Sequence, residues 1–251
     1  MIEVDRSGGV TTLTLTRPAR RNALDADMIR DLCAALATAE ADADCRCVVL
    51  KGAAGTFCSG RDLAAAADLR GLVPVLEYDE GYAKIFLQLT HLGKPSVAVV
   101  QGYAVAGGFT LAMGCDFVLA EANAQFGALE MKHGFPAALN SAVLAHKALP
   151  RHALELLLSA GTHGAQRLYE MGLVNRIAAD AAQLARIEAE FVAGLLALDP
   201  LAVKLTKETL RAAASMPYAE ALTLGKQLNA LLMASGRIAE AQQVRTPRKP
   251  E

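Results

Sequence analysis

A short apolar strand followed by a glycine-rich turn constrains this chain more than any other feature. Ser96–Val100 is apolar and rich in β-branched residues, which predicts a buried strand. A loop with Gly102 follows, and the pair Gly107 and Gly108 stands where a helical pattern begins. The first N–H groups of a helix have no partner inside it, and glycine lets another molecule approach them closely. The stretch therefore predicts an anion or oxyanion site.

Several known glycine-rich motifs can be compared with this stretch. A dinucleotide fingerprint needs G-x-G-x-x-G, a spacing that Gly102, Gly107 and Gly108 do not have. A P-loop begins correctly, but Gly108 and Phe109 stand where Lys and Ser/Thr are required. Two interpretations stay open: the N–H of Gly107 stabilises a negative oxygen formed on a carbonyl, or the turn carries no chemistry.

Composition indicates a globular chain with a large core. The chain has 251 residues, 53% of them hydrophobic, which suggests one domain or one domain with an appendage. A formal net charge of -1 argues against electrostatic binding of nucleic acid. Pro95–Ala120 is apolar enough for a membrane span, yet Gln101, Thr110, Asp116 and its glycines favour a buried strand, turn and helix. We therefore expect neither nucleic acid nor a membrane as a partner.

Signals for secretion and for metal binding are missing from the sequence. Its first ten residues, MIEVDRSGGV, lack the basic start and apolar core of a secretory signal. The five cysteines are odd in number and lack paired metal-ligand spacing, so free thiols in a reducing compartment are the default. The histidines form no H-E-x-x-H or similar cluster. We expect a cytoplasmic protein without a metal site.

A second glycine turn follows another predicted strand, Cys47–Leu50. Gly60 lies just before an alanine-rich helical pattern, as Gly107 does in the first turn. Alternating strands and helices predict a mostly parallel sheet, in which ligands bind beyond the carboxyl ends of the strands. Further predicted elements are a strand at 10–16, a helix capped by Asp25, a break at 72–75 around Pro74, a strand at 115–120, an extended piece at 173–177, and helices at 180–198, 201–214 and 218–233.

With both turns placed, the sequence resembles the crotonase superfamily, which includes enoyl-CoA hydratases and isomerases. The resemblance implies an α/β spiral of strand-strand-helix repeats with a helical C-terminal region. It implies an acyl-CoA-binding core over residues 1–195, a helical trimerisation or lid region over 196–251, and assembly into trimers or hexamers. It also implies an acyl-CoA substrate, with coenzyme A as part of the substrate and no separate cofactor. The matching segments, in family order, are RPARRNALDADMIRDL, FCSGRDL, KPSVAVVQGYAVAGGFTLAMGCDFVLA, AQFGALEMKHGFP and AQRLYEMGLVNRI.

The resemblance assigns the catalytic groups position by position. The backbone N–H groups of Arg61 and Gly107 match the two donors that hold the thioester oxygen as it becomes an enolate, and Glu130 matches the acid/base. Thr110 stands where hydratases of the family have a second glutamate. Substrate-binding positions carried over from the family are Arg21, Ala23, Gly60, Asp62, Leu63, Gly108 and Phe135, with the positive charge of Arg20 and Arg21 suited to phosphate groups.

The missing second glutamate favours double-bond isomerisation, because one base can remove a proton from C2 and return it at C4. Hydration of a 2-enoyl-CoA is the alternative, and it requires a replacement acid. An acyl-CoA-binding protein with little catalysis is a third hypothesis. Candidates for a replacement acid are Asp62, Glu77, Asp79, Glu80, Tyr82 and His133.

Overall fold

The computed structural model describes residues 1–62 and 70–235. The chain divides into two compact units, Met1–Pro200 and Leu201–Glu251. The expected division into a binding core and a trimerisation or lid region stays a prediction, because compactness does not test the role of either part. The helix expected directly after Gly60 falls outside the described residues.

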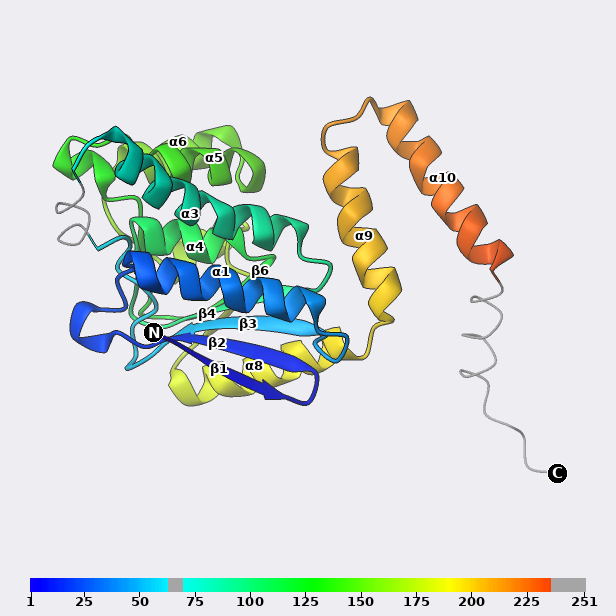
Figure 1. Ribbon diagram of the computed structural model, residues 1–251, viewed down its shortest axis with the longest axis horizontal. Coiled ribbons are helices and arrows are strands. Elements are labelled where there is room, and N and C mark those ends of the chain that lie inside the picture. The colour runs from blue at the N-terminus through cyan, green and yellow to red at the C-terminus, as the bar shows by residue number, and fades with distance from the viewer. Residues whose placement is uncertain (63–69, 236–251) are drawn as a thin grey trace. The chain divides into compact units, whose positions relative to one another are not determined.

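The first unit is built around a six-stranded sheet with helices on both faces (Figure 1). From β2 to β9 the paired strands run parallel, and β1 is antiparallel to β2 at one edge. This confirms the predicted α/β fold with a mostly parallel sheet. The strands, in spatial order, are β1 (Ile2–Ser7), β2 (Val10–Leu15), β3 (Cys47–Gly52), β4 (Ser96–Val100), β6 (Phe117–Glu121) and β9 (Arg176–Ala178).

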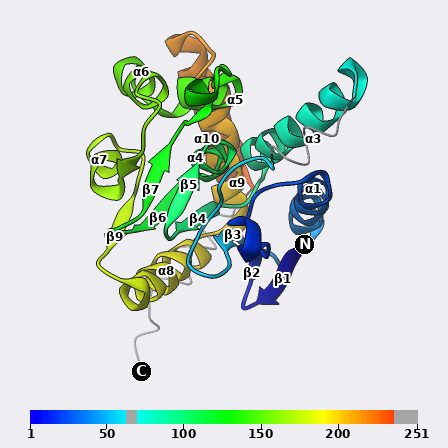
Figure 2. The same cartoon turned by 90° about the vertical axis from the view of Figure 1, so that its left-hand side faces the viewer.

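A second, smaller sheet carries the segments that follow the strands of the first. It has three strands, with β7 parallel to β5 and antiparallel to β8. Figure 2 shows β5 and β7 beside α4. These strands are too short to give a periodic signal in the sequence, and none of them was predicted. They are β5 (Tyr103–Val105), β7 (Gln125–Gly127) and β8 (His163–Gly164).

The helices of the first unit cover the two faces of the large sheet. Helices α1, α3 and α4 lie over one face and α8 over the other (Figure 1). The first unit contains η1 (Pro18–Arg20), α1 (Ala26–Ala41), α3 (Leu72–His91), α4 (Gly107–Gly114), η2 (Glu130–His133), α5 (Ala138–Lys147), α6 (Pro150–Leu158), α7 (Ala165–Glu170) and α8 (Ala181–Leu196). The second unit contains α9 (Pro200–Ala213), apart from its first residue, and α10 (Tyr218–Ala234).

Strand β4 shows why the sequence pattern was informative. Every residue of β4 is buried, as expected of a central parallel strand covered on both faces. Ala98 and Val100 belong to the core beneath α1, α3 and α4, whereas Val97 and Val99 belong to the core beneath α8. Successive side chains point to opposite faces of a strand, so one continuous apolar run supplies both cores.

Local signals predicted some element ends correctly and one wrongly. Asp25 caps α1 as expected, because its side chain accepts a hydrogen bond of 2.8 Å from the N–H of Met28. The predicted break at 72–75 is wrong, since α3 begins at Leu72 and Pro74 lies in its first turn. Proline is tolerated there because the first N–H groups of a helix have no intrahelical partner.

The apolar stretch from Pro95 to Ala120 forms β4, β5, α4 and the start of β6. It therefore folds as strands, a turn and a short helix. Within residues 1–62 and 70–235, no helix is both long enough and apolar enough to cross a membrane.

Candidate functional site

The two glycine turns, distant in the sequence, lie against each other. The turn after β3 pairs with β5, because Cys58 donates to the carbonyl of Tyr103 at 2.9 Å. A side-chain carbon built on Gly60 would lie 2.8 Å from the nitrogen of Gly107. One built on Gly107 would lie 3.3 Å from the nitrogen of Arg61. The structure thus brings together the backbone N–H groups of Arg61 and Gly107, here termed the donor pair.

Neither member of the donor pair is used by the surrounding backbone. Leu24 donates to the carbonyl of Gly60 and accepts from Asp62, both at 2.8 Å, so the N–H of Arg61 points away from Leu24. Gly107 is the first residue of α4, where an N–H has no acceptor inside the helix. In the described part of the chain, neither N–H donates to a backbone carbonyl of a neighbouring segment. Two such donors can stabilise one negatively charged oxygen.

Two of the glycines make room for this arrangement. Gly60 has a φ of +98°, which side chains rarely adopt. A carbon built on Gly108 would lie 2.1 Å from the carbonyl oxygen of Cys58, so only glycine lets α4 pack this closely on the turn. The family resemblance predicts that Gly60 and Gly108 lie near the substrate. Their packing alone explains why glycine stands at both positions.

The side chain of Arg61 faces α3. It forms an ion pair with Asp79, and its guanidinium carbon lies 5.7 Å from the ring centres of both Tyr78 and Tyr82. The hydroxyl of Tyr82 donates to the carbonyl of Gly107 at 2.5 Å. Burial raises the pKa of Tyr82, so this hydroxyl stays neutral. The contacts of α3 therefore hold both turns that carry the donor pair.

Glu130 lies at the start of η2, close to the N-terminal end of α4. Its Oε1 accepts a hydrogen bond of 2.9 Å from Nδ2 of Asn140. The same Nδ2 lies 3.4 Å from the carbonyl oxygen of Ala106, the residue before Gly107. The second oxygen, Oε2, is buried and has no hydrogen-bond partner among the described residues. Burial raises the pKa of Glu130, which suits a group that must accept and release a proton.

Thr110 is buried beside this carboxylate but makes no direct bond to it. Its hydroxyl donates to Oδ1 of Asn140 at 2.7 Å. Asn140 therefore joins Thr110 to Glu130, although no sequence motif pointed to it. The sequence pattern gives only a weak indication of this role. Asn140 and Leu144 are the buried residues of α5, so a polar side chain lies on the buried face of the helix. A buried amide with both ends bonded needs partners that sequence alone does not reveal.

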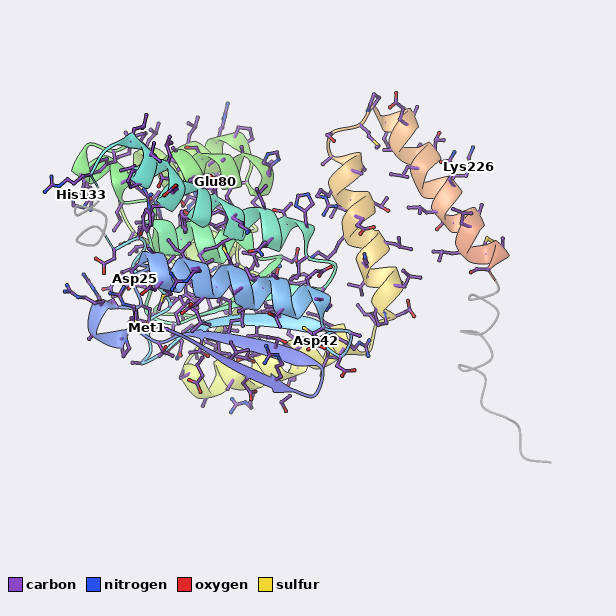
Figure 3. All side chains as sticks on the ribbon, in the orientation of Figure 1. Met1, Asp25, Asp42, Glu80, His133 and Lys226 are labelled. Carbon is purple, nitrogen blue, oxygen red and sulfur yellow. The ribbon has the colours of Figure 1, made fainter. Side chains whose placement is uncertain are left out.

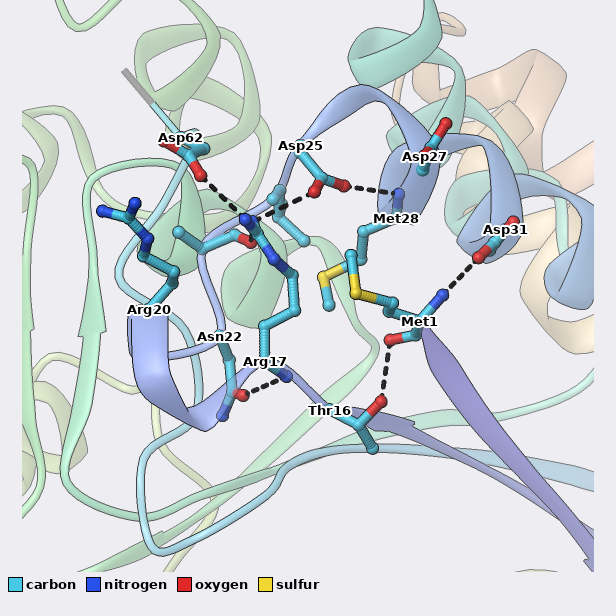
Figure 4. Close-up of polar contacts among 12 residues, drawn as sticks. Met1, Thr16, Arg17, Arg20, Asn22, Asp25, Asp27, Met28, Asp31 and Asp62 are labelled. Carbon is cyan, nitrogen blue, oxygen red and sulfur yellow. Dashed lines mark hydrogen bonds and ion pairs between the residues drawn. The ribbon is translucent and has the colours of Figure 1, made fainter. Parts of the chain in front are cut away.

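The other candidate carboxylates and His133 are either held in ion pairs or exposed. Asp62 forms an ion pair of 3.0 Å with Arg17, which Figure 4 shows between Asp25 and Asp62. Asp79 pairs with Arg61. The remaining carboxylates and the histidine are exposed: Glu77 lines an open groove of about 590 Å³ between α1 and α3, and Glu80 and His133 lie on the surface (Figure 3). Of the candidate acids on α3, Asp79 and Tyr82 contact the donor-pair turns, Asp79 at the guanidinium of Arg61 and Tyr82 at the carbonyl of Gly107.

The remaining predicted binding positions fall in three segments of the chain. Ala23 is buried, and its carbonyl accepts from the guanidinium of Arg17 at 2.6 Å. Arg20 and Arg21 are exposed on the loop that precedes it. Phe135 exposes 58% of its surface, while its N–H donates to the carbonyl of Glu130. Leu63 lies outside the described residues. The roles of these positions stay predictions.

The sheet topology and the helices around it define the class of protein: a crotonase-type α/β fold. A family model described as enoyl-CoA hydratase/isomerase matches residues 5–245. The chain belongs to the enoyl-CoA hydratase/isomerase family. Its membership confirms the resemblance on which the expected fold was based.

Individual relatives match this chain in sequence or structure over most of its length. Enoyl-CoA hydratase EchA19 of Mycobacterium tuberculosis is 34% identical, and the match covers 90% of this chain and 85% of EchA19. The (E)-benzylidenesuccinyl-CoA hydratase of Thauera aromatica is 32% identical over 86% of this chain and 84% of its own. The crystal structure of a Mycobacterium smegmatis enoyl-CoA hydratase superposes with a TM-score of 0.89 at 28% identity, covering 100% of this chain and 98% of that one.

Proposed function

We propose that this protein isomerises the double bond of an enoyl-CoA, with Glu130 as a single acid/base and the donor pair as an oxyanion hole. One observation carries the proposal. Among the described residues near the donor pair, Glu130 has a buried carboxylate oxygen with no partner, while Thr110 occupies the position of the second glutamate. An isomerase needs one proton acceptor that can also return the proton.

The chemistry follows from these groups. Glu130 removes a proton from C2 of a 3-enoyl-CoA, and the electron pair moves onto the thioester oxygen to give a dienolate. The N–H groups of Arg61 and Gly107 donate to that oxygen, whose negative charge develops in the transition state. Glu130 then delivers the same proton to C4, which leaves the conjugated 2-enoyl-CoA. The net reaction moves one proton and one double bond and needs no water.

Binding of the coenzyme A portion is proposed from exposed charge and from position. Arg20 and Arg21 lie on the loop next to the turn of Gly60, where two cations suit phosphate groups. Ala23 and Asp62 border this turn, because Leu24, the residue after Ala23, donates to the carbonyl of Gly60 and accepts from the N–H of Asp62. Leu63 is proposed as a binding position from the family resemblance alone. The exposed ring of Phe135 stands five residues after Glu130 and is proposed to contact the acyl group. Coenzyme A enters as part of the substrate, so no separate cofactor is invoked.

Hydration of a 2-enoyl-CoA is the second candidate, and the names of the relatives favour it. EchA19 and the Thauera aromatica protein are both called hydratases. Hydration needs a second group to share the work of activating water and delivering a proton. The hydroxyl groups of Thr110 and Tyr82 are already committed as donors to Asn140 and to the carbonyl of Gly107. This commitment makes isomerisation the better-supported proposal.

Absorbance of the conjugated enoyl thioester distinguishes these reactions. With a 3-enoyl-CoA as substrate, we expect the absorbance to rise as the double bond moves into conjugation. With a 2-enoyl-CoA, we expect the absorbance to stay constant because water is not added. Falling absorbance with the 2-enoyl-CoA, together with a 3-hydroxyacyl product identified by mass, would make the protein a hydratase. Tight acyl-CoA binding without turnover of either substrate would make it a binding protein.

The pH dependence of turnover should report the ionisation of Glu130. The base is active only when ionised, so kcat/KM should fall as the pH drops through the pKa of Glu130 in the free enzyme. Burial raises this pKa above the ordinary glutamate value of 4.5, so the acid limb should lie above pH 4.5. The measurement is kcat/KM against pH with the 3-enoyl-CoA. An acid limb at or below pH 4.5 would contradict a buried carboxylate base.

Self-association is proposed for the second unit. Neither α9 nor α10 contains a fully buried residue, although large apolar side chains such as Leu210, Leu222 and Leu231 are exposed on them. Apolar helix faces of this kind are normally covered in the working protein. A trimer or hexamer of this chain would cover them and fits the expectation from the sequence.

A further inference from the structure

Asn140 connects Thr110 and Glu130 in the candidate site. It is 2% exposed, lies on α5, and contacts both residues at the two acid positions of the family pattern. Its Oδ1 accepts from Thr110 at 2.7 Å, and its Nδ2 donates to Glu130 at 2.9 Å. A buried amide whose two ends are both bonded has one well-defined orientation.

The carboxylate of Glu130 and the carbonyl of Ala106 determine which end of the amide faces Glu130. Both groups can only accept, and both lie at Nδ2 of Asn140, at 2.9 and 3.4 Å. The opposite orientation would place an amide oxygen against a carboxylate oxygen. Oδ1 is left for the hydroxyl of Thr110, which donates to it at 2.7 Å. Thr110 therefore contacts Glu130 only through Asn140.

The consequence for Glu130 is an asymmetric carboxylate. Oε1 is occupied by Asn140, whereas Oε2 is buried without a partner in the described residues. Since proton transfer needs a free lone pair at a fixed position, Oε2 is the oxygen left for it. The charged and titratable groups that face this carboxylate are Arg61 and Tyr82, from the turn after β3 and from α3.

We propose that Asn140 is a positioning residue, which holds Oε1 of Glu130 so that Oε2 exchanges the proton, and that Thr110 supports the Asn140 amide by donating to its Oδ1. This inference rests on the proposed function, because it assigns the proton transfer to Glu130. It gives Thr110 a role as the hydrogen-bond donor to Oδ1 of Asn140. In place of a second carboxylate, the chain has a hydroxyl and an amide that orient the first.

Two variants of Asn140 test the proposal. Asn140→Ala removes the donor to Glu130, and a lost hydrogen bond to a charged group is expected to lower kcat about 10- to 100-fold with little change in KM. Asn140→Asp keeps the shape and the acceptor for Thr110 but places a like charge beside Glu130. Asn140 donates to the ionised form and lowers the pKa of Glu130. Both variants should therefore move the acid limb of the pH profile upward, Asn140→Asp further than Asn140→Ala.

Ser141→Ala is the matched control on the same helix. Ser141 is exposed and its hydroxyl only donates to the carbonyl of Ala137, so kcat and the pH profile should match those of the wild type. If the wild type and Ser141→Ala convert neither enoyl-CoA, the proposed function fails. If they are active and folded Asn140→Asp and Asn140→Ala keep the wild-type kcat and acid limb, the positioning role alone is overturned.

A measurement without substrate separates the two failures further. With ¹³C-labelled glutamate, the Glu130 carboxyl signal is identified by its loss in Glu130→Gln. Its pKa should be higher in Asn140→Asp than in the wild type, whether or not either protein turns over a substrate. Equal pKa values in the two proteins would overturn the contact between Asn140 and Glu130.

Discussion

Replacing Glu130 by glutamine is expected to lower turnover of the 3-enoyl-CoA about 10²–10⁴-fold, the usual contribution of a general acid/base. Glutamine has nearly the same shape and its amide oxygen still accepts from Nδ2 of Asn140. It cannot take up a proton from C2 of the substrate. Since both donor-pair N–H groups stay in place, acyl-CoA binding should change little. The measurements are kcat by ultraviolet absorbance and acyl-CoA affinity by calorimetry.

Glu121→Gln is a matched control for this substitution. Glu121 is half-buried at the end of β6, and its Oε2 accepts from the side-chain amide of Gln101 at 3.1 Å. It thus resembles Glu130 in burial and in having an amide partner, but it belongs to a different strand end. Turnover by Glu121→Gln should stay close to that of the wild type. Near wild-type turnover by Glu130→Gln would remove Glu130 from the mechanism.

Gly107→Ala is expected to lower kcat/KM about 10²–10³-fold, the loss typical of removing one oxyanion donor. The added methyl group would lie 2.8 Å from the hydroxyl of Tyr82 and 3.3 Å from the nitrogen of Arg61. It would therefore enter the space between the two turns, where the thioester oxygen is proposed to bind. Tyr82 is 1% exposed and cannot swing away easily. The measurement is kcat/KM of the purified, folded variant.

Gly194→Ala controls for the change from glycine to alanine itself. Gly194 lies in α8, and a carbon built on it meets nothing within 4 Å. Alanine is favoured over glycine in a helix interior, so this variant should fold well and keep its activity. Wild-type activity of folded Gly107→Ala, measured beside this control, would show that the thioester oxygen does not bind between the two turns.

Local sequence patterns predicted the elements that hold the site. The run Ser96–Val100, the glycine pair at 107 and the cap at Asp25 each depend on residues within a few positions of one another. They are correspondingly found where expected. The break around Pro74 was wrong because proline ends helices in general but fits their first turn.

What the sequence could not show is which distant side chains meet. The approach of the Gly60 turn to Gly107 depends on the pairing of Cys58 with β5, a strand of three residues with no periodic signal. Asn140 is a further case, because its two partners lie 30 and 10 residues away. The family resemblance supplied Glu130 and Thr110, but it carried no information about the amide that joins them.

Because the proposed oxyanion donors are main-chain atoms, side-chain substitution cannot delete them. Alanine at position 61 would still present an N–H to the substrate, and its cost would come from losing the anchor to Asp79 and the tyrosine rings. Alanine scanning would thus underestimate the contribution of the Arg61 N–H to catalysis. It would show large effects at the glycines instead, where the added methyl group blocks the site. The space around Gly60, Gly107 and Gly108 therefore limits which residues this part of the site tolerates, although none of the three carries a functional group.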